Sequence, residues 1–150
     1  MTGLLHLDDF TEGQTFDLGT VSVSTDEIVS FARTFDPQAF HVDPSAAAQS
    51  PFGGLIASGW HTASLFMRLY VDRVLLRSAC LGSPGVSDLR WHLPVRADET
   101  LRGIMTVSKV EHSAKRPDRG TLWPQCEFVN QEGRVVFSMV LITILRRRQN

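Results

Sequence analysis

The arrangement of apolar and polar residues changes once along this chain. As far as about residue 76, apolar residues recur at helical intervals, whereas beyond Pro84 they follow the patterns of strands. From Ser24 to Phe35 an apolar residue returns every three or four positions, and Ser24 and Glu27 have the spacing of a capping box. This segment is predicted to be an amphipathic helix that ends at Asp36, because Pro37 disfavours the helical conformation in the residue before it.

Two more helices are predicted before the strands begin. Asp43 and Pro44 precede a run of alanines, which is typical of a short helix with aspartate at the N-cap and proline at the first helical position. A turn at residues 51–54 then leads into a long helix from about Ser58 to about Leu76. Apolar residues cover most of the circumference of this helix, so we expect it to be buried on several sides.

The second half of the chain is predicted to form a sheet. Strands are expected near Val86–Leu93, Leu101–Glu111, Leu122–Val129 and Val135–Leu145, with a further one around Val21 and Val23. One long helix followed by four or more antiparallel strands predicts an α+β fold in which a curved sheet wraps around the helix. The last residues, Arg146 to Asn150, are predicted to be a frayed polar tail.

Composition and charge narrow the range of partners. The 150 residues carry a formal net charge of −1, so no overall positive field exists to attract nucleic acid or an anionic membrane. The two cysteines, Cys80 and Cys126, lack the density of a disulfide framework and the spacing of a zinc site, and we interpret them as reduced thiols. Acidic residues near the start and the lack of a long apolar run favour a cytoplasmic protein.

The candidate chemistry is concentrated between Asp36 and Gly59. A carboxylate at Asp36 precedes the imidazole of His41 by five residues, and Gly59 stands at the start of the long predicted helix. Spacing alone leaves simpler interpretations open: Asp36 as a turn residue, His41 as a hydrogen-bonded loop histidine, and Gly59 as a site of close helix packing. A metal site is also conceivable, and its ligands would be Asp36, His41, Asp43 and His61. No pair among them has the helical spacing of a zinc motif, and His61 is expected to be a satisfied polar group.

At the level of motifs, the segment from Asp36 to Asp43, followed by Phe52 to Gly59, resembles the hydratase signature of the MaoC-like dehydratases, which include the (R)-specific enoyl-CoA hydratases. Leu93 to Thr100 is similar to the Pro-Val-x-x-Gly-Asp turn of that family. Three departures are a phenylalanine in place of glycine before Asp36, Gln38-Ala39 in place of Asn-Pro, and Ser58 in place of a common histidine. The resemblance implies a single hotdog domain over residues 1–150 that works as a homodimer or larger assembly without a metal or redox cofactor.

This resemblance also implies a reaction and a set of roles. The substrate would be a trans-2-enoyl thioester of coenzyme A or of an acyl carrier, hydrated reversibly to an (R)-3-hydroxyacyl thioester. Asp36 would be the base, His41 would hold the water, and the N–H of Gly59 would meet the thioester oxygen at a helix N-terminus. The residues expected to contact substrate are Ser58, Trp60, Phe52, Arg116 and Arg119.

Several alternatives to these roles stay open. Arg116 and Arg119 lie in the predicted hairpin of residues 112–120, where their guanidinium groups would bind the phosphates of coenzyme A or would simply be solvated in a turn. Trp60 is as suited to the core as to an acyl pocket. The whole protein could instead hydrolyse acyl thioesters with Asp36 activating water, or bind acyl-CoA as a subunit without turnover. Product analysis separates these reactions, because hydrolysis releases a free thiol and hydration does not.

Overall fold

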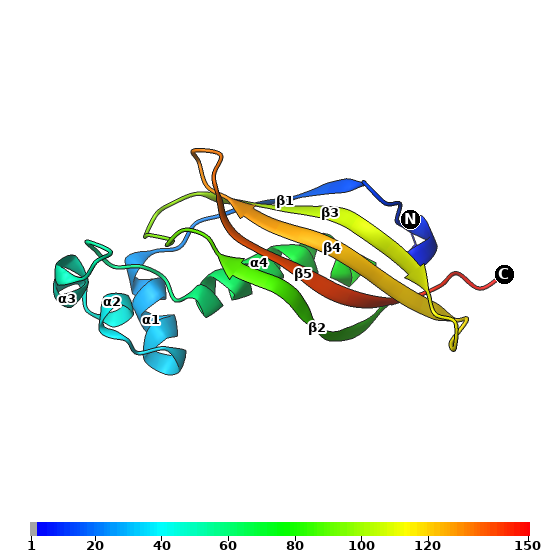
Figure 1. Cartoon of the computed structure of the whole chain (residues 1–150), viewed down its shortest axis with the longest axis horizontal. Helices are drawn as coiled ribbons and strands as arrows, with labels where there is room; N and C mark the ends of the chain where they lie inside the picture. The colour runs from blue at the N-terminus through cyan, green and yellow to red at the C-terminus, as the bar shows by residue number, and fades with distance from the viewer. Residues whose placement is uncertain (1–2) are drawn as a thin grey trace.

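The computed structural model describes residues 3–150 and contains one antiparallel five-stranded sheet (Figure 1). Its strands are β1 (Thr15–Val21), β2 (Cys80–Trp91), β3 (Leu101–His112), β4 (Arg119–Val129) and β5 (Val135–Arg146). They lie side by side in the order β1-β3-β4-β5-β2, so that β1 and β2 form the two edges. The predicted α+β architecture is confirmed.

The helices take up two positions relative to this sheet. The longest, α4 (Gly59–Arg73), runs along one face of the sheet, and the short helices gather beyond one end of it (Figure 1). The short ones at that end are α1 (Thr25–Phe35), α2 (Ala39–Val42) and α3 (Pro44–Gln49), while the 3₁₀ helices η1 (Leu7–Asp9) and η2 (Leu75–Arg77) lie elsewhere. The chain from α1 to the start of α4 therefore forms a separate cap on the sheet's end.

Helix boundaries follow the capping signals in the sequence. The Ser24 hydroxyl accepts the backbone N–H of Glu27 at 3.1 Å, and the Glu27 carboxylate accepts the N–H of Ser24 at 3.3 Å, which confirms the capping box of α1. Asp43 caps α3 by accepting the N–H groups of Ser45 and Ala46. The long helix ends three residues earlier than predicted, and η2 follows it. Helix α2 was not predicted, because a single turn is too short to display a helical period.

β4 begins at Arg119, three residues earlier than predicted, and β3 and β5 each extend one residue further, while the larger differences are in β1 and β2. β1 ends at Val21 and therefore does not include Val23. β2 begins at Cys80, six residues earlier than expected, and includes Pro84 and two glycines that look like strand breakers in the sequence. These residues are tolerated because β2 is an edge strand whose pairing with β5 shifts register three times.

The core lies between α4 and the sheet. Phe66 of α4 is fully buried, with its ring centre 5.1 Å from that of Phe128 on β4. The buried hydroxyl of Tyr70 donates to Thr143 at 3.2 Å, because Thr143 donates its own proton to the carbonyl of Leu141. Only one stripe of α4 is fully buried, so the expected burial on several sides is wrong for a single chain.

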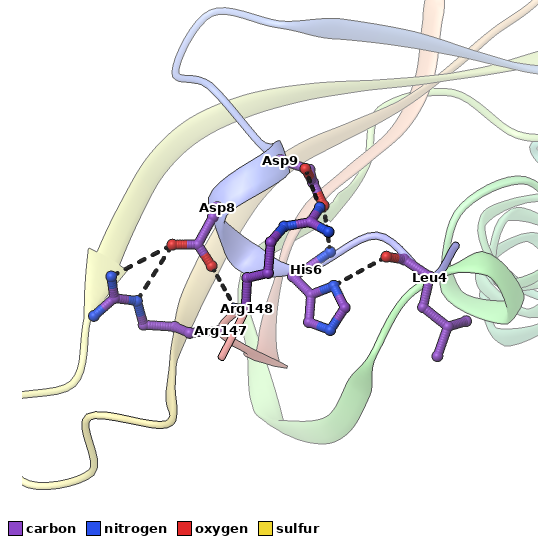
Figure 2. Close-up of polar contacts among 6 residues, drawn as sticks. All are labelled: Leu4, His6, Asp8, Asp9, Arg147 and Arg148. Atoms are coloured by element: carbon purple, nitrogen blue, oxygen red, sulfur yellow. Dashed lines mark hydrogen bonds and ion pairs between the residues drawn. The ribbon is translucent and has the colours of Figure 1, made fainter. Parts of the chain in front are cut away.

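The chain end is not a frayed tail, and that prediction is wrong. Arg147 lies 3.4 Å from the Asp8 carboxylate, Arg148 pairs with Asp9, and the backbone N–H of Arg148 donates to Asp8 at 2.8 Å (Figure 2). We call these four residues the terminal clasp. Hydrogen bonds from Arg148 lower the pKa of both carboxyl groups. The sequence could not reveal the clasp, because its partners lie 139 or 140 positions apart.

The remaining expectations concern thiols and membranes. Cys80 and Cys126 are both free, and burial raises the pKa of the Cys126 thiol to about 12, so that this thiol stays protonated. Within residues 3–150, no helix combines the length and apolar character that crossing a membrane requires.

Candidate active site

A pocket of about 550 Å³ opens where the capping helices meet the sheet. Its walls come from the end of α1, from α2, from the start of α4, and from the end of β2 with the loop that follows. Five residues singled out in the sequence line it: Asp36, His41, Phe52, Gly59 and Trp60. The fold thus brings the predicted acid–base pair and the predicted oxyanion donor to one cavity.

Asp36 is the C-cap residue of α1, and both oxygens of its carboxylate accept a hydrogen bond. Its Oδ1 accepts the side-chain amide of Gln38 at 2.8 Å, and its Oδ2 accepts the hydroxyl of Ser58 at 2.7 Å. The Nε2 atom of His41 lies 3.3 Å from the same Oδ2. Pro37 ends the helix here, and the chain turns so that the carboxylate faces these three groups.

The electrostatics of Asp36 favour the ionised form. Partial burial acts to raise the pKa of this carboxyl, but the hydrogen bonds from Gln38 and Ser58 and the charge of His41 outweigh it. The net pKa of Asp36 is lowered. Near neutral pH the pocket therefore contains a carboxylate that can accept a proton.

His41 lies on α2 and is buried, with 4% of its surface exposed. Its Nδ1 lies 2.7 Å from the carbonyl oxygen of Ile56. A carbonyl oxygen can only accept, so Nδ1 carries a proton, and in the neutral ring the lone pair is on Nε2, which faces Asp36. A neutral His41 can hold or deprotonate a water through Nε2, while a protonated one can donate to the carboxylate.

Gly59 is the first residue of α4, so its N–H has no partner within the helix. The dipole of α4 makes a negative charge favourable at this N–H. Close packing at this glycine is one of the interpretations that the sequence leaves open, and the structure supports it. The direction in which a Cβ would point is filled by the indole of Trp91, whose Cδ2 and Nε1 would lie 2.7 Å from that atom. Trp91 also donates its indole N–H to the Gly59 carbonyl at 2.8 Å.

Other predicted site residues have different surroundings. Ser58 is completely buried and its hydroxyl donates to Asp36, whereas a contact with the substrate was expected. Phe52 and Trp60 both line the pocket, and Trp60 is 58% exposed. The ring of His61 stacks on Phe31, but its buried Nδ1 lacks a partner within the described part of the chain, so the expectation of a satisfied group is wrong.

The hairpin that carries Arg116 and Arg119 lies far from this pocket. It joins β3 to β4 at the end of the sheet opposite α1, α2 and α3 (Figure 1). Asp118 accepts two hydrogen bonds from Arg119, at 3.0 and 3.1 Å, and partly neutralises it. Among residues 3–150, no group of three or more histidine, cysteine or acidic side chains is arranged to hold a metal ion, and Asp43 acts as a helix cap.

Two residues of the site were missed from the sequence. Gln38 was noted only as a departure from the family's motif, although an amide two residues after an aspartate and one after a proline is placed for a local side-chain bond. Trp91 gave no signal, because its contact with Gly59 spans 32 positions and depends on how β2 packs against α4.

Comparison with known proteins finds a matching family and relatives that align over most of the chain. Residues 9–121 match the family described as the MaoC like domain. YdeM, an uncharacterized protein of Bacillus subtilis, is 32% identical over 95% of this chain and 100% of its own length. The 3-hydroxyacyl-thioester dehydratase Z of Mycobacterium tuberculosis is 33% identical over 61% of this chain and 62% of its own.

The crystal structure of the MaoC-like dehydratase from Rhodospirillum rubrum superposes with a TM-score of 0.90 at 39% identity, covering 97% of this chain and 99% of that one. The family match and this structural likeness both extend over most of the chain. The antiparallel sheet around a long helix is the hotdog fold that the motifs predicted. This chain therefore belongs to the MaoC-like dehydratase family.

Proposed function

We propose that this protein adds water reversibly to a trans-2-enoyl thioester and forms a (R)-3-hydroxyacyl thioester. The observation that carries the proposal is the convergence of three groups on one pocket: the Asp36 carboxylate, the Nε2 of His41, and the N-terminus of α4 at Gly59. Hydration needs a base for the water and a donor for the oxygen that becomes negative, and these groups can supply both.

The proposed reaction begins with a water held between Asp36 and Nε2 of His41. Asp36 takes one proton from this water, and the oxygen of the water bonds to Cβ of the substrate. The electrons of the double bond move toward the thioester carbonyl, where the N–H of Gly59 and the α4 dipole stabilise the charge. The proton is then delivered to Cα, so that one water has been added and both carboxylate and imidazole return to their starting states.

The pocket also bears on the substrate class. Its volume of about 550 Å³ lies within the range typical of small-molecule sites, and its walls include Phe40, Phe52 and Leu93. An apolar cavity of this size suits a small or medium acyl chain. The curated relative whose name gives an activity is a 3-hydroxyacyl-thioester dehydratase, which supports a thioester of coenzyme A or an acyl carrier as the substrate.

The direct test is product analysis with the purified protein and a series of trans-2-enoyl-CoA thioesters. Asp36→Asn should lower kcat by at least about 10²-fold, because it removes the base and keeps the shape, and His41→Ala should act similarly. Asp43→Asn is the matched control: Asp43 lies outside the pocket, and asparagine caps a helix as well as aspartate does. Full hydration by Asp36→Asn would refute the mechanism, and release of free thiol would identify a hydrolase instead.

We also propose that the active form is at least a homodimer. Val86 and Trp91 on the edge strand β2 are 46% and 44% exposed, and several apolar residues of α4 are only half-buried. A second copy would cover these surfaces through a two-fold interface. Light scattering at micromolar protein should give at least twice the mass of the 16.7 kDa chain, and an active monomer would refute the proposal.

Arg116 and Arg119 stay proposed contacts for the phosphates of coenzyme A. The twelve residues of β3 separate their hairpin from the pocket, roughly 40 Å at about 3.3 Å per residue. Such a contact would therefore have to serve the pocket of another copy. Arg116→Glu with Arg119→Glu should raise KM for coenzyme A substrates and leave kcat nearly unchanged, and an unaltered KM at low salt would refute the role.

A further inference from the structure

The N-terminus of α4 is in direct contact with an aromatic side chain from the edge of the sheet. Trp91, the last residue of β2, lays its indole against the Cα of Gly59, in the space that any other residue would fill with its Cβ. The indole N–H donates to the carbonyl of Gly59 at 2.8 Å. The ring also meets Trp60 edge to face, with ring centres 5.1 Å apart.

This contact explains why residue 59 is a glycine. Adding a Cβ at residue 59 would force overlap with three atoms of the indole. The overlap cannot be relieved easily, because the ring is held by its hydrogen bond to the helix and by Trp60. The identity of residue 59 is therefore set by the side chain of residue 91.

Trp91 also lies beside the place where charge would develop. Its indole lines the same pocket as Gly59 and covers the Cα next to the N–H that would meet the thioester oxygen. A hydrogen bond from an N–H to an oxyanion is stronger where water is excluded, since the surrounding dielectric is lower. The indole occupies the Cβ direction of Gly59, so water cannot occupy that side of the first residue of α4.

We propose that Trp91 is a positioning residue for the thioester carbonyl: it fixes the N-terminus of α4 against β2 and shields the Gly59 N–H from water. This inference rests on the proposed function, in which that N–H stabilises the oxygen of the substrate. It assigns Trp91 a role that acts through Gly59, and it predicts that the two residues are coupled in catalysis as well as in packing.

The test is a double-mutant cycle with Gly59→Ala, Trp91→Ala and the double variant, assayed for hydration of crotonyl-CoA and for thermal unfolding. Gly59→Ala should lower kcat/KM at least tenfold in the wild-type background and have little further effect in the Trp91→Ala background. Trp91→Ala alone should lower kcat more than it changes KM, because the shielding matters most in the transition state. Trp91→Phe keeps an apolar ring but loses the N–H that donates to the Gly59 carbonyl, so its kcat should lie between those of the wild type and Trp91→Ala.

Gly85→Ala is the control for a glycine-to-alanine change on the strand that carries Trp91. Gly85 lies on the same strand and has open space where a Cβ would be added, so this variant should match the wild type in both backgrounds. An equal loss of kcat/KM from Gly59→Ala with and without Trp91 would overturn the proposal, because it would mean that the substrate itself requires the glycine. Wild-type kcat and KM in Trp91→Ala, with coupling seen only in unfolding, would also overturn it.

A failure of the proposed hydratase activity can be distinguished from a failure of the Trp91 proposal. If the wild type hydrated no enoyl-CoA, the same variants would be titrated with butyryl-CoA by calorimetry, which reports carbonyl binding without turnover. Coupled losses of butyryl-CoA affinity in the cycle would support the Trp91 proposal on its own. Affinities that were independent in the two backgrounds would reject it.

Discussion

Replacing Ser58 tests how the fold keeps the carboxyl group of Asp36 ionised. This serine is completely buried, and its hydroxyl donates to Oδ2 of Asp36 at 2.7 Å. Replacing Ser58 with alanine removes that donor and leaves the backbone of α4 and the carboxylate in place. The change therefore isolates one of the interactions that lower the pKa of Asp36.

The size of the effect follows from the type of bond. A hydrogen bond to a charged group contributes about 1.5–3 kcal/mol, and about 1.4 kcal/mol corresponds to one pH unit. Losing the donor destabilises the ionised carboxylate relative to the protonated form, so the pKa of Asp36 should rise. Because the base must be ionised to accept a proton, the acidic limb of the pH profile should move to higher pH by at least about one unit.

The assay is kcat/KM for hydration of crotonyl-CoA measured from about pH 3 to pH 9, because the lowered pKa of Asp36 places the acidic limb of the wild type below the ordinary carboxyl range. Ser64→Ala is the matched control, since Ser64 lies on the same helix, is exposed and donates its hydroxyl to the carbonyl of Trp60. Its profile should overlay that of the wild type. An acidic limb that stayed in place in Ser58→Ala would refute the assignment of Asp36 as the base, whatever the change in rate.

Three further predictions concern stability. Gly120→Ala should destabilise the protein by about 1–3 kcal/mol in chemical unfolding, because the new Cβ would overlap Leu7 and the carbonyl oxygen of Glu111; an unchanged midpoint would contradict this packing. Tyr70→Phe should cost about 1 kcal/mol by removing a buried hydrogen bond to Thr143, and thermal unfolding of Thr143→Val alongside should show that the two losses do not add. Arg148→Ala should lower the unfolding midpoint only slightly, and this loss should vanish in high salt. Since Asp8 and Asp9 have lowered pKa values in the folded state, the clasp stabilises above the ordinary carboxyl range and is lost as the pH falls below it, so a cost that persisted at acid pH would be inconsistent with ion pairing.

Local signals in the sequence were sufficient for much of the fold. The capping box at Ser24, the N-cap at Asp43 and the alternation along β4 each depend on residues a few positions apart, and each predicted its element correctly. The pairing of Asp36 with His41 was predicted for the same reason, since both lie in one short segment with a recognisable motif, and the two side chains lie 3.3 Å apart in the pocket. Information of this range is carried by backbone preference and periodicity.

What the sequence could not provide depends on contacts between distant segments. The packing of Trp91 on Gly59 and the clasp between Asp8 and Arg147 require the folded sheet, and no periodicity marks either pair. The bounds of β2 failed for a related reason: Pro84 is a strand breaker unless the strand lies at an edge, and edge position is a property of the whole sheet. Ser58 was assigned to the substrate because a motif records which residues are present and not which way they face.

The hydrogen bonds around His41 affect how the sequences of such proteins can diverge. The carbonyl of Ile56 accepts from His41, the N–H of Ile56 donates to the carbonyl of Phe40 at 3.1 Å, and Ser58 reaches back to Asp36. These bonds join the two ends of one continuous stretch of chain, so the geometry of the site is inherited as a unit. Mutations can replace the apolar residues of the sheet other than Trp91 one by one, as long as they fill the core, and leave the reacting groups in register.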